Sequence, residues 1–241
     1  MKSAQDERAA ETCEWILRHE IVEKWRTDPT HDGFLWVYGN PGTGKTIITG
    51  KMIDSLTSTT VQDRLRVPLL YFFCNSKTGD IRKNNVTAVL RSFLFQLWAP
   101  LCEDDNFSSD WDSILELNQN SSRELILLEK ILTRVFSDAA PQYIVIDAVD
   151  ECKETETLVK AIRRLCASAK QKPKVYLTSR PEECRKLKSE DDSILEMSLQ
   201  NTQTDIRCFV SAKLEDSKFD HLSRDMKEEI KLHLIDNANG M

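Results

Sequence analysis

Apolar residues along the chain fall into short runs that alternate with longer stretches of helical spacing. Five short runs are typical of buried strands, and they lie at residues 34–38, 69–74, 143–147, 174–178 and 194–199. Helical spacing is found at residues 4–27, after residue 45, and at 86–97, 121–136, 154–170, 202–216 and 222–238. Strands that alternate with helices predict an α/β fold, a three-layer sandwich with a five-stranded parallel sheet and helices on both faces.

Breaks in this pattern divide the chain into three parts. A helix in residues 1–30 leads into the sheet, and a turn-rich stretch at residues 27–33 separates the two. Residues 31–200 hold all five predicted strands and form the predicted core. Residues 201–241 read as C-terminal helices. Because nothing follows them to pack against, we expect them to begin a helical region that is cut from a longer protein.

The glycine-rich segment at residues 39–46, with sequence GNPGTGKT, directly follows the first predicted strand and opens the next helix. It fits the phosphate-binding P-loop, in which backbone N–H groups and the helix N-terminus point at an anion. Lys45 is expected to reach the β- and γ-phosphates, and the Thr46 hydroxyl to bind Mg²⁺. The predicted nucleotide-binding residues are Gly39, Asn40, Pro41, Gly42, Thr43, Gly44, Lys45, Thr46 and Ile47.

A second acidic motif ends the third predicted strand, with sequence YIVIDAVDEC from residue 143. Because carboxyl ends of parallel strands face the ligand crevice, Asp147 is expected to hold Mg²⁺ together with Thr46. A carboxylate just beyond can orient or deprotonate a water that attacks the γ-phosphate. Glu151 is the first choice for this role and Asp150 the second. The alternative is that both acids form the solvated entry to the following helix.

Arg180 follows the fourth predicted strand, in the segment LTSRP. At that sheet edge it could sense the γ-phosphate, and its alternative role is an ordinary surface or ion-pairing arginine.

Composition narrows the class of protein. The 33 basic and 39 acidic residues give a net charge of −6, which argues against a general nucleic-acid surface. No apolar run is long enough to span a membrane, and the N-terminus lacks the apolar core of a secretory signal. The seven cysteines are scattered, and none form a C-x-x-C pair. This is typical of reduced thiols, so we expect a cytoplasmic protein.

Taken together, the P-loop, the IDAVDEC segment and the LTSRP segment resemble the NACHT NTPase domain of the STAND class, and are similar to versions found in fungal NOD-like receptors. The resemblance implies a sheet with the P-loop strand central and the Asp147 strand two positions away. It also implies a switch with ATP or GTP bound in the active state and ADP or GDP at rest, self-association, signalling in innate immunity, and effector and repeat domains in the same chain. Ala148 stands where many animal members carry glycine.

Three other functions remain open at this stage. A small-molecule kinase would share the P-loop, but it needs an acceptor pocket and usually an arginine-bearing lid, and no arginine-rich segment is found. A non-hydrolysing scaffold would retain the fold alone, and the intact Lys45, Thr46, Asp147 and Glu151 argue against it. An AAA+-like mechanical ATPase would need an arginine from a neighbouring subunit. No motif distinguishes ATP from GTP.

Overall fold

The computed structural model describes residues 12–31, 33–60, 69–76, 84–98 and 121–237. Its centre is one sheet of five strands, which run in the order β2-β3-β4-β1-β5, and all neighbouring strands are parallel. The strands are β1 (Leu35–Tyr38), β2 (Leu69–Phe73), β3 (Tyr143–Asp147), β4 (Lys174–Ser179) and β5 (Ser193–Glu196). The predicted α/β sandwich is therefore confirmed.

The position of the P-loop strand differs from the one that the family resemblance implies. β4, not β1, occupies the middle of the sheet, and β1 lies between β4 and the edge strand β5. The strand that ends in Asp147 does lie two positions from β1, as expected. Because β4 separates them, the residues that end β4 stand directly between the P-loop and Asp147.

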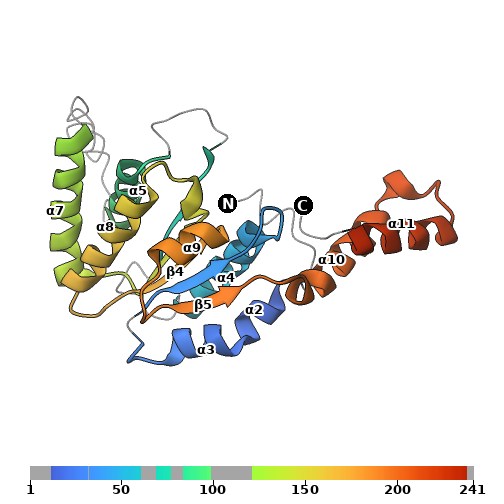
Figure 1. Ribbon diagram of the computed structural model, residues 1–241, viewed down its shortest axis with the longest axis horizontal. Coiled ribbons are helices and arrows are strands. Elements are labelled where there is room, and N and C mark those ends of the chain that lie inside the picture. The colour runs from blue at the N-terminus through green and yellow to red at the C-terminus, as the bar shows by residue number, and fades with distance from the viewer. Residues whose placement is uncertain (1–11, 32, 61–68, 77–83, 99–120, 238–241) are drawn as a thin grey trace.

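Helices cover both faces of the sheet (Figure 1). Alternate residues of each strand point to opposite faces, so Leu35 and Val37 pack in one core cluster and Trp36 in the other. The first cluster contains α2 (Glu14–Arg18), α3 (Glu20–Thr27) and α4 (Lys45–Thr60). The second contains α5 (Val86–Trp98), α7 (Ser121–Ala139) and α8 (Thr155–Ser168).

The prediction of a single helix at residues 4–27 is wrong for residues 12–27, the part that the structure describes. Cys13 has a left-handed backbone, with φ 64°, and two helices follow that are separated at His19. His19 is extended, and its Nδ1 accepts the Ile21 N–H at 3.3 Å, so it caps the second helix. Residues 4–11 lie outside the described part of the chain.

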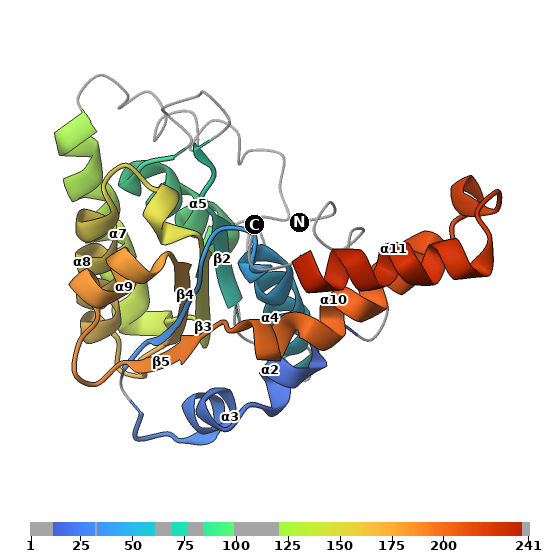
Figure 2. The same cartoon turned by 45° about the vertical axis from the view of Figure 1, so that its right-hand side comes forward.

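The end of the chain also differs from the prediction in detail. β5 ends at Glu196, and α10 (Leu199–Leu214) begins at the last residue that was assigned to the strand. A short helix that was not predicted, α9 (Pro181–Leu187), follows β4. The short 3₁₀ helix η5 (Ser217–Phe219) joins α10 to α11 (Arg224–Asn237), and the two long helices extend away from the sheet as an arm (Figure 2).

Two further features bear on the class of protein. Within the described ranges, no helix is long and apolar enough to cross a membrane. Six cysteines lie in the described part of the chain, and none of them forms a disulfide bond there: Cys13, Cys74, Cys152, Cys166, Cys184 and Cys208.

Candidate nucleotide site

The P-loop connects β1 to α4 at the carboxyl edge of the sheet, as predicted. Gly42 and Gly44 have φ of 82° and 84°, a backbone conformation that side chains with a Cβ rarely adopt. The Thr43 hydroxyl donates to the Asn40 carbonyl at 2.8 Å, which closes the turn. Gly39 to Gly44 therefore form the loop, and Lys45, Thr46 and Ile47 begin the helix whose N-terminus faces it.

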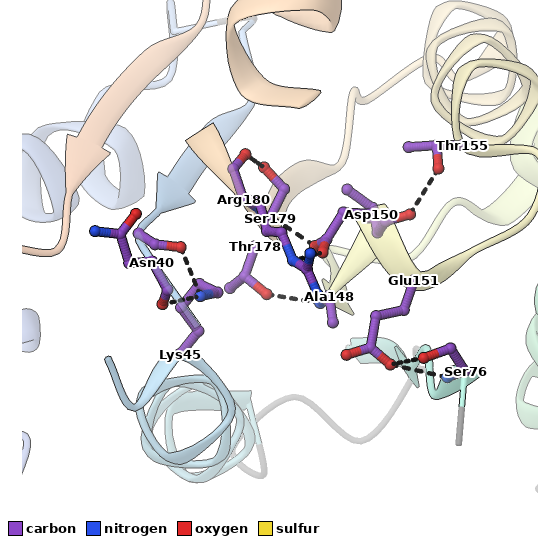
Figure 3. Close-up of polar contacts among 12 residues, drawn as sticks. Asn40, Lys45, Ser76, Ala148, Asp150, Glu151, Thr155, Thr178, Ser179 and Arg180 are labelled. Atoms are coloured by element: carbon purple, nitrogen blue, oxygen red, sulfur yellow. Dashed lines mark hydrogen bonds and ion pairs between the residues drawn. The ribbon is translucent and has the colours of Figure 1, made fainter. Parts of the chain in front are cut away.

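The ammonium of Lys45 curls back over the loop. Its Nζ donates to the Gly39 carbonyl at 2.7 Å and to the Asn40 carbonyl at 2.8 Å (Figure 3). Burial lowers the pKa of Lys45, and the nearby Asp150 and Asp147 carboxylates oppose this shift. The cation thus already stands above the loop where a phosphate would bind.

Asp147 ends β3 and is almost fully buried, with 2 % of its surface exposed. Three threonine hydroxyls donate to its carboxylate: Thr46 to Oδ2 at 2.7 Å, and Thr49 and Thr178 to Oδ1 at 2.8 and 2.7 Å. A buried carboxylate requires such partners. The bond from Thr46 brings together the two residues that were predicted to hold Mg²⁺, and a hydroxyl and a carboxylate are oxygen ligands that suit this ion.

Thr49 and Thr178 were not predicted to belong to the site. Thr49 follows Thr46 by three residues, so the two lie on one face of α4, and this spacing was the only available signal. Thr178 also accepts the Ala148 N–H at 2.7 Å, and thereby joins β4 to the turn after β3. This contact depends on the strand order, which the sequence did not reveal.

The two acids after β3 lie on a 3₁₀ turn, η4 (Val149–Glu151), and they point in different directions. Asp150 faces Arg180: its Oδ2 lies 3.1 Å from the Arg180 Nε, and its Oδ1 accepts the Arg180 backbone N–H at 3.2 Å. Burial raises the pKa of the Asp150 carboxyl, while Arg180 opposes this rise. The predicted Arg180 is therefore paired with Asp150 at the sheet edge.

Glu151 turns toward the segment that follows β2. Its Oε2 accepts the Ser76 backbone N–H at 2.8 Å and the Ser76 hydroxyl at 3.1 Å (Figure 3). Ser76 was not predicted, because its role rests on β2 and β3 being neighbours. The structure thus brings Lys45, Thr46, Asp147, Asp150 and Arg180 to the ends of three adjacent strands, with Glu151 beside them.

Comparison with known proteins agrees with this geometry. A family model described as Nephrocystin 3, N-terminal, matches residues 11–180. The chain belongs to this family. It is also 28 % identical over 240 residues to the vegetative incompatibility protein HET-E-1 of Podospora anserina, a match that covers 94 % of this chain and 17 % of that protein. These two matches confirm the resemblance to NACHT domains of fungal NOD-like receptors.

Solved structures share the fold. Drosophila ORC bound to DNA matches with a TM-score of 0.58 and 14 % identity over 99 % of this chain and 56 % of that chain. ORC2 of Aeropyrum pernix, solved as ADPNP–ADP complexes, matches with a TM-score of 0.50 and 9 % identity over 94 % and 67 % of the two chains. The chain thus has the α/β fold of P-loop NTPases. It spans about a sixth of the length of the curated relative it matches.

Proposed function

We propose that this domain is a molecular switch that binds ATP or GTP with Mg²⁺, hydrolyses it slowly, and thereby controls self-association of a longer protein. The observation that carries the proposal is the Lys45 ammonium, which stands over the P-loop on the carbonyls of Gly39 and Asn40. The β- and γ-phosphates of a nucleotide offer this cation charged acceptors in place of two neutral ones, and charge-assisted hydrogen bonds are the stronger kind. The N-terminus of α4 favours the same anion.

Thr46 and Asp147 would hold Mg²⁺, which neutralises charge that develops on the phosphates during transfer. The Thr46 hydroxyl donates to Asp147 at 2.7 Å, so the two oxygens lie side by side. The further bonds from Thr49 and Thr178 fix the carboxylate in place. These bonds would hold the two oxygen ligands in place before the ion binds.

For hydrolysis, Glu151 is the proposed base that orients the attacking water, with Asp150 as the second choice. Arg180 is the proposed sensor of the γ-phosphate. Its guanidinium is about half exposed and held by one carboxylate, so it can exchange that partner for a phosphate oxygen. A triphosphate and a diphosphate would then leave the Asp150–Arg180 pair in different arrangements, which is the difference that a two-state switch requires.

The wider context of the proposal comes from the relative. HET-E-1 is a much longer protein, which supports the expectation of effector and repeat domains in the same chain as this one. We propose a cytoplasmic setting, since the scattered cysteines are typical of reduced thiols. We also propose that the domain has no nucleic-acid partner, since its net charge is −6. ADP or GDP would occupy the resting state.

The first test is calorimetric titration of the nucleotide-free protein with Mg-ATP and Mg-GTP. Lys45→Ala should weaken binding at least a hundred-fold, because the cation over the phosphates is lost. Lys51→Ala is the matched control, since Lys51 also lies on α4 but pairs with Glu14 away from the loop. Unchanged affinity in Lys45→Ala would refute the assignment of the P-loop, and the two titrations together give the base preference.

Release of inorganic phosphate separates the remaining alternatives. Slow release that depends on Mg²⁺ supports the switch, whereas binding without release leaves a non-hydrolysing scaffold. A kinase would transfer phosphate to an added small acceptor faster than to water. In the calorimetric titration, Arg180→Ala should show reduced discrimination between the triphosphate and the diphosphate.

A further inference from the structure

Asn84 is a buried polar residue outside the predicted site, and only 4 % of its surface is exposed. It lies just before α5, and its side chain bonds to two segments, one that follows β2 and one that follows the neighbouring strand β3. Its Oδ1 accepts the Asn75 backbone N–H at 3.2 Å, and its Nδ2 donates to the backbone carbonyl of Glu151. Its own carbonyl accepts the Lys153 N–H at 3.2 Å. Asn84 therefore ties the segment after β2 to the turn after β3.

These bonds close a ring around Glu151. Asn84 holds the backbone of Glu151, while Ser76, the neighbour of Asn75, holds its carboxylate. On the opposite side of the same turn, Asp150 is paired with Arg180. Contacts on both sides thus hold the main chain between β3 and α8 in place. On the side of the Glu151 carboxylate, Asn84 provides the hydrogen bond to the main chain.

We propose that Asn84 is a positioning residue for hydrolysis, which acts by fixing where the Glu151 carboxylate stands relative to the γ-phosphate. The inference rests on the proposed function, because it needs Glu151 to act on the attacking water. A buried amide of this kind gives one fixed arrangement, since both of its hydrogen-bonding ends are used. A displacement of about 1 Å in a catalytic group can reduce a rate by about a hundred-fold.

The test is a double-mutant cycle on phosphate release, with nucleotide affinity measured alongside. Asn84→Ala should lower kcat about ten-fold or more while the affinity for the triphosphate stays within about two-fold, since Asn84 does not contact the P-loop. Glu151→Gln should lower kcat by itself. In the double variant, the loss of Asn84 should have no further effect, because it acts through Glu151.

Two variants guard against a merely structural effect. Asn85→Ala is the matched control: the Asn85 Oδ1 accepts the Ala88 N–H at 2.8 Å at the start of α5, so its loss weakens a helix cap without touching Glu151. It should keep the wild-type kcat. Asn84→Asp retains the size of the side chain and an oxygen facing Asn75 but removes the donor to the Glu151 carbonyl. It should lower kcat about ten-fold or more, and it provides an independent test if the alanine variant fails to fold.

The outcomes separate this inference from the proposed function. Suppose that the wild type hydrolyses nucleotide through Glu151, and that Asn84→Ala lowers kcat by the same factor in the wild type and in the Glu151→Gln background. The positioning role of Asn84 is then wrong, and the proposed function stands. An unchanged kcat in both Asn84 variants would also show that the positioning role is wrong. If the wild type binds nucleotide without hydrolysis, or Glu151→Gln hydrolyses normally, then the proposed catalytic role and the inference fall together.

Discussion

At the scale of single residues, Ala148 links backbone conformation to the chemistry of the site. It follows Asp147 and has φ 53° and ψ 52°, a left-handed conformation that an alanine adopts at a cost of about 1–2 kcal/mol. In return, its N–H reaches the Thr178 hydroxyl that also supports Asp147. Ala148 directly precedes the 3₁₀ turn on which Asp150 and Glu151, as consecutive residues, point in different directions.

Ala148→Gly should therefore stabilise the protein, by up to about 1 kcal/mol, because glycine adopts this conformation without a steric penalty. Ala212→Gly is the control with the same chemical change. Ala212 is an exposed residue within α10, where glycine should instead cost about 1 kcal/mol. Urea unfolding of the three proteins measures both effects. A loss of stability in Ala148→Gly as large as that in Ala212→Gly would show that Ala148 is not strained.

At the scale of elements, α8 is fastened to the connection between α9 and β5 at the edge of the sheet away from the site. The Arg163 guanidinium pairs with both oxygens of Asp192, at 2.6 and 3.2 Å, and lies 4.3 Å from the centre of the Phe34 ring. The Asp192 side chain has no exposed surface, and it also accepts the backbone N–H groups of Phe34 and Ser189. The pair thus joins three segments of the chain.

Arg163→Met keeps most of the length of the side chain but leaves a buried carboxylate without its cation. We expect a loss of about 3 kcal/mol, near the lower limit for a broken buried pair, because two backbone N–H groups still donate to Asp192. The control is Arg134→Met, since the Arg134–Asp138 pair on α7 is largely exposed and should contribute less than about 0.5 kcal/mol. Equal losses in the two variants, measured by chemical denaturation, would contradict this reading.

The elements also show which parts of the fold a sequence can reveal. Apolar spacing predicted all five strands and the long helices, because burial on one or two faces leaves a direct periodic trace. It did not show the break at His19, where an imidazole serves as a helix cap. α9 was missed although Pro181 at its start and Glu182 and Glu183 in its first turn are helix signals. Its seven residues are too few to display a period.

The residues of the candidate site likewise fall into those that the sequence could predict and those that it could not. The residues of the P-loop and Asp147 could be predicted because their roles follow from local chain geometry next to a strand end. Ser76 and Asn84 could not, since their roles depend on which strands are neighbours. The partners of the two acids also required the structure: the two residues are adjacent in the sequence, but on the 3₁₀ turn Asp150 pairs with Arg180 and Glu151 with Ser76.

At the scale of the whole molecule, the arm of α10 and α11 is joined to the N-terminal helix by one carboxylate. Asp205 of α10 accepts the Cys13 backbone N–H at 2.8 Å and the Trp15 indole N–H at 2.9 Å. The two bonds connect segments at opposite ends of the described chain. They hold the first turn of α2 in place as well as the base of the arm.

Trp15→Phe should loosen this joint while leaving the sheet intact, because one hydrogen bond contributes about 1 kcal/mol. We expect backbone amides of α10 to exchange with deuterium about five-fold faster, with no change in the five strands. Trp25→Phe is the control, because the Trp25 indole N–H is buried and has no hydrogen-bond partner among the described residues. Faster exchange throughout both variants would indicate a general loss of packing rather than a local joint.

The order of the strands also sets an order of events during synthesis. β1 carries the P-loop and is made before the other four strands of the described sheet, in which its neighbours are β4 and β5, with Leu35 opposite Tyr176 and Ser193. At typical translation rates, β1 therefore waits about ten seconds or more for a neighbour, while β2 and β3 can already pair with each other. The nucleotide site is thus completed last, and a growing chain cannot bind nucleotide productively until nearly all of the sheet has been made.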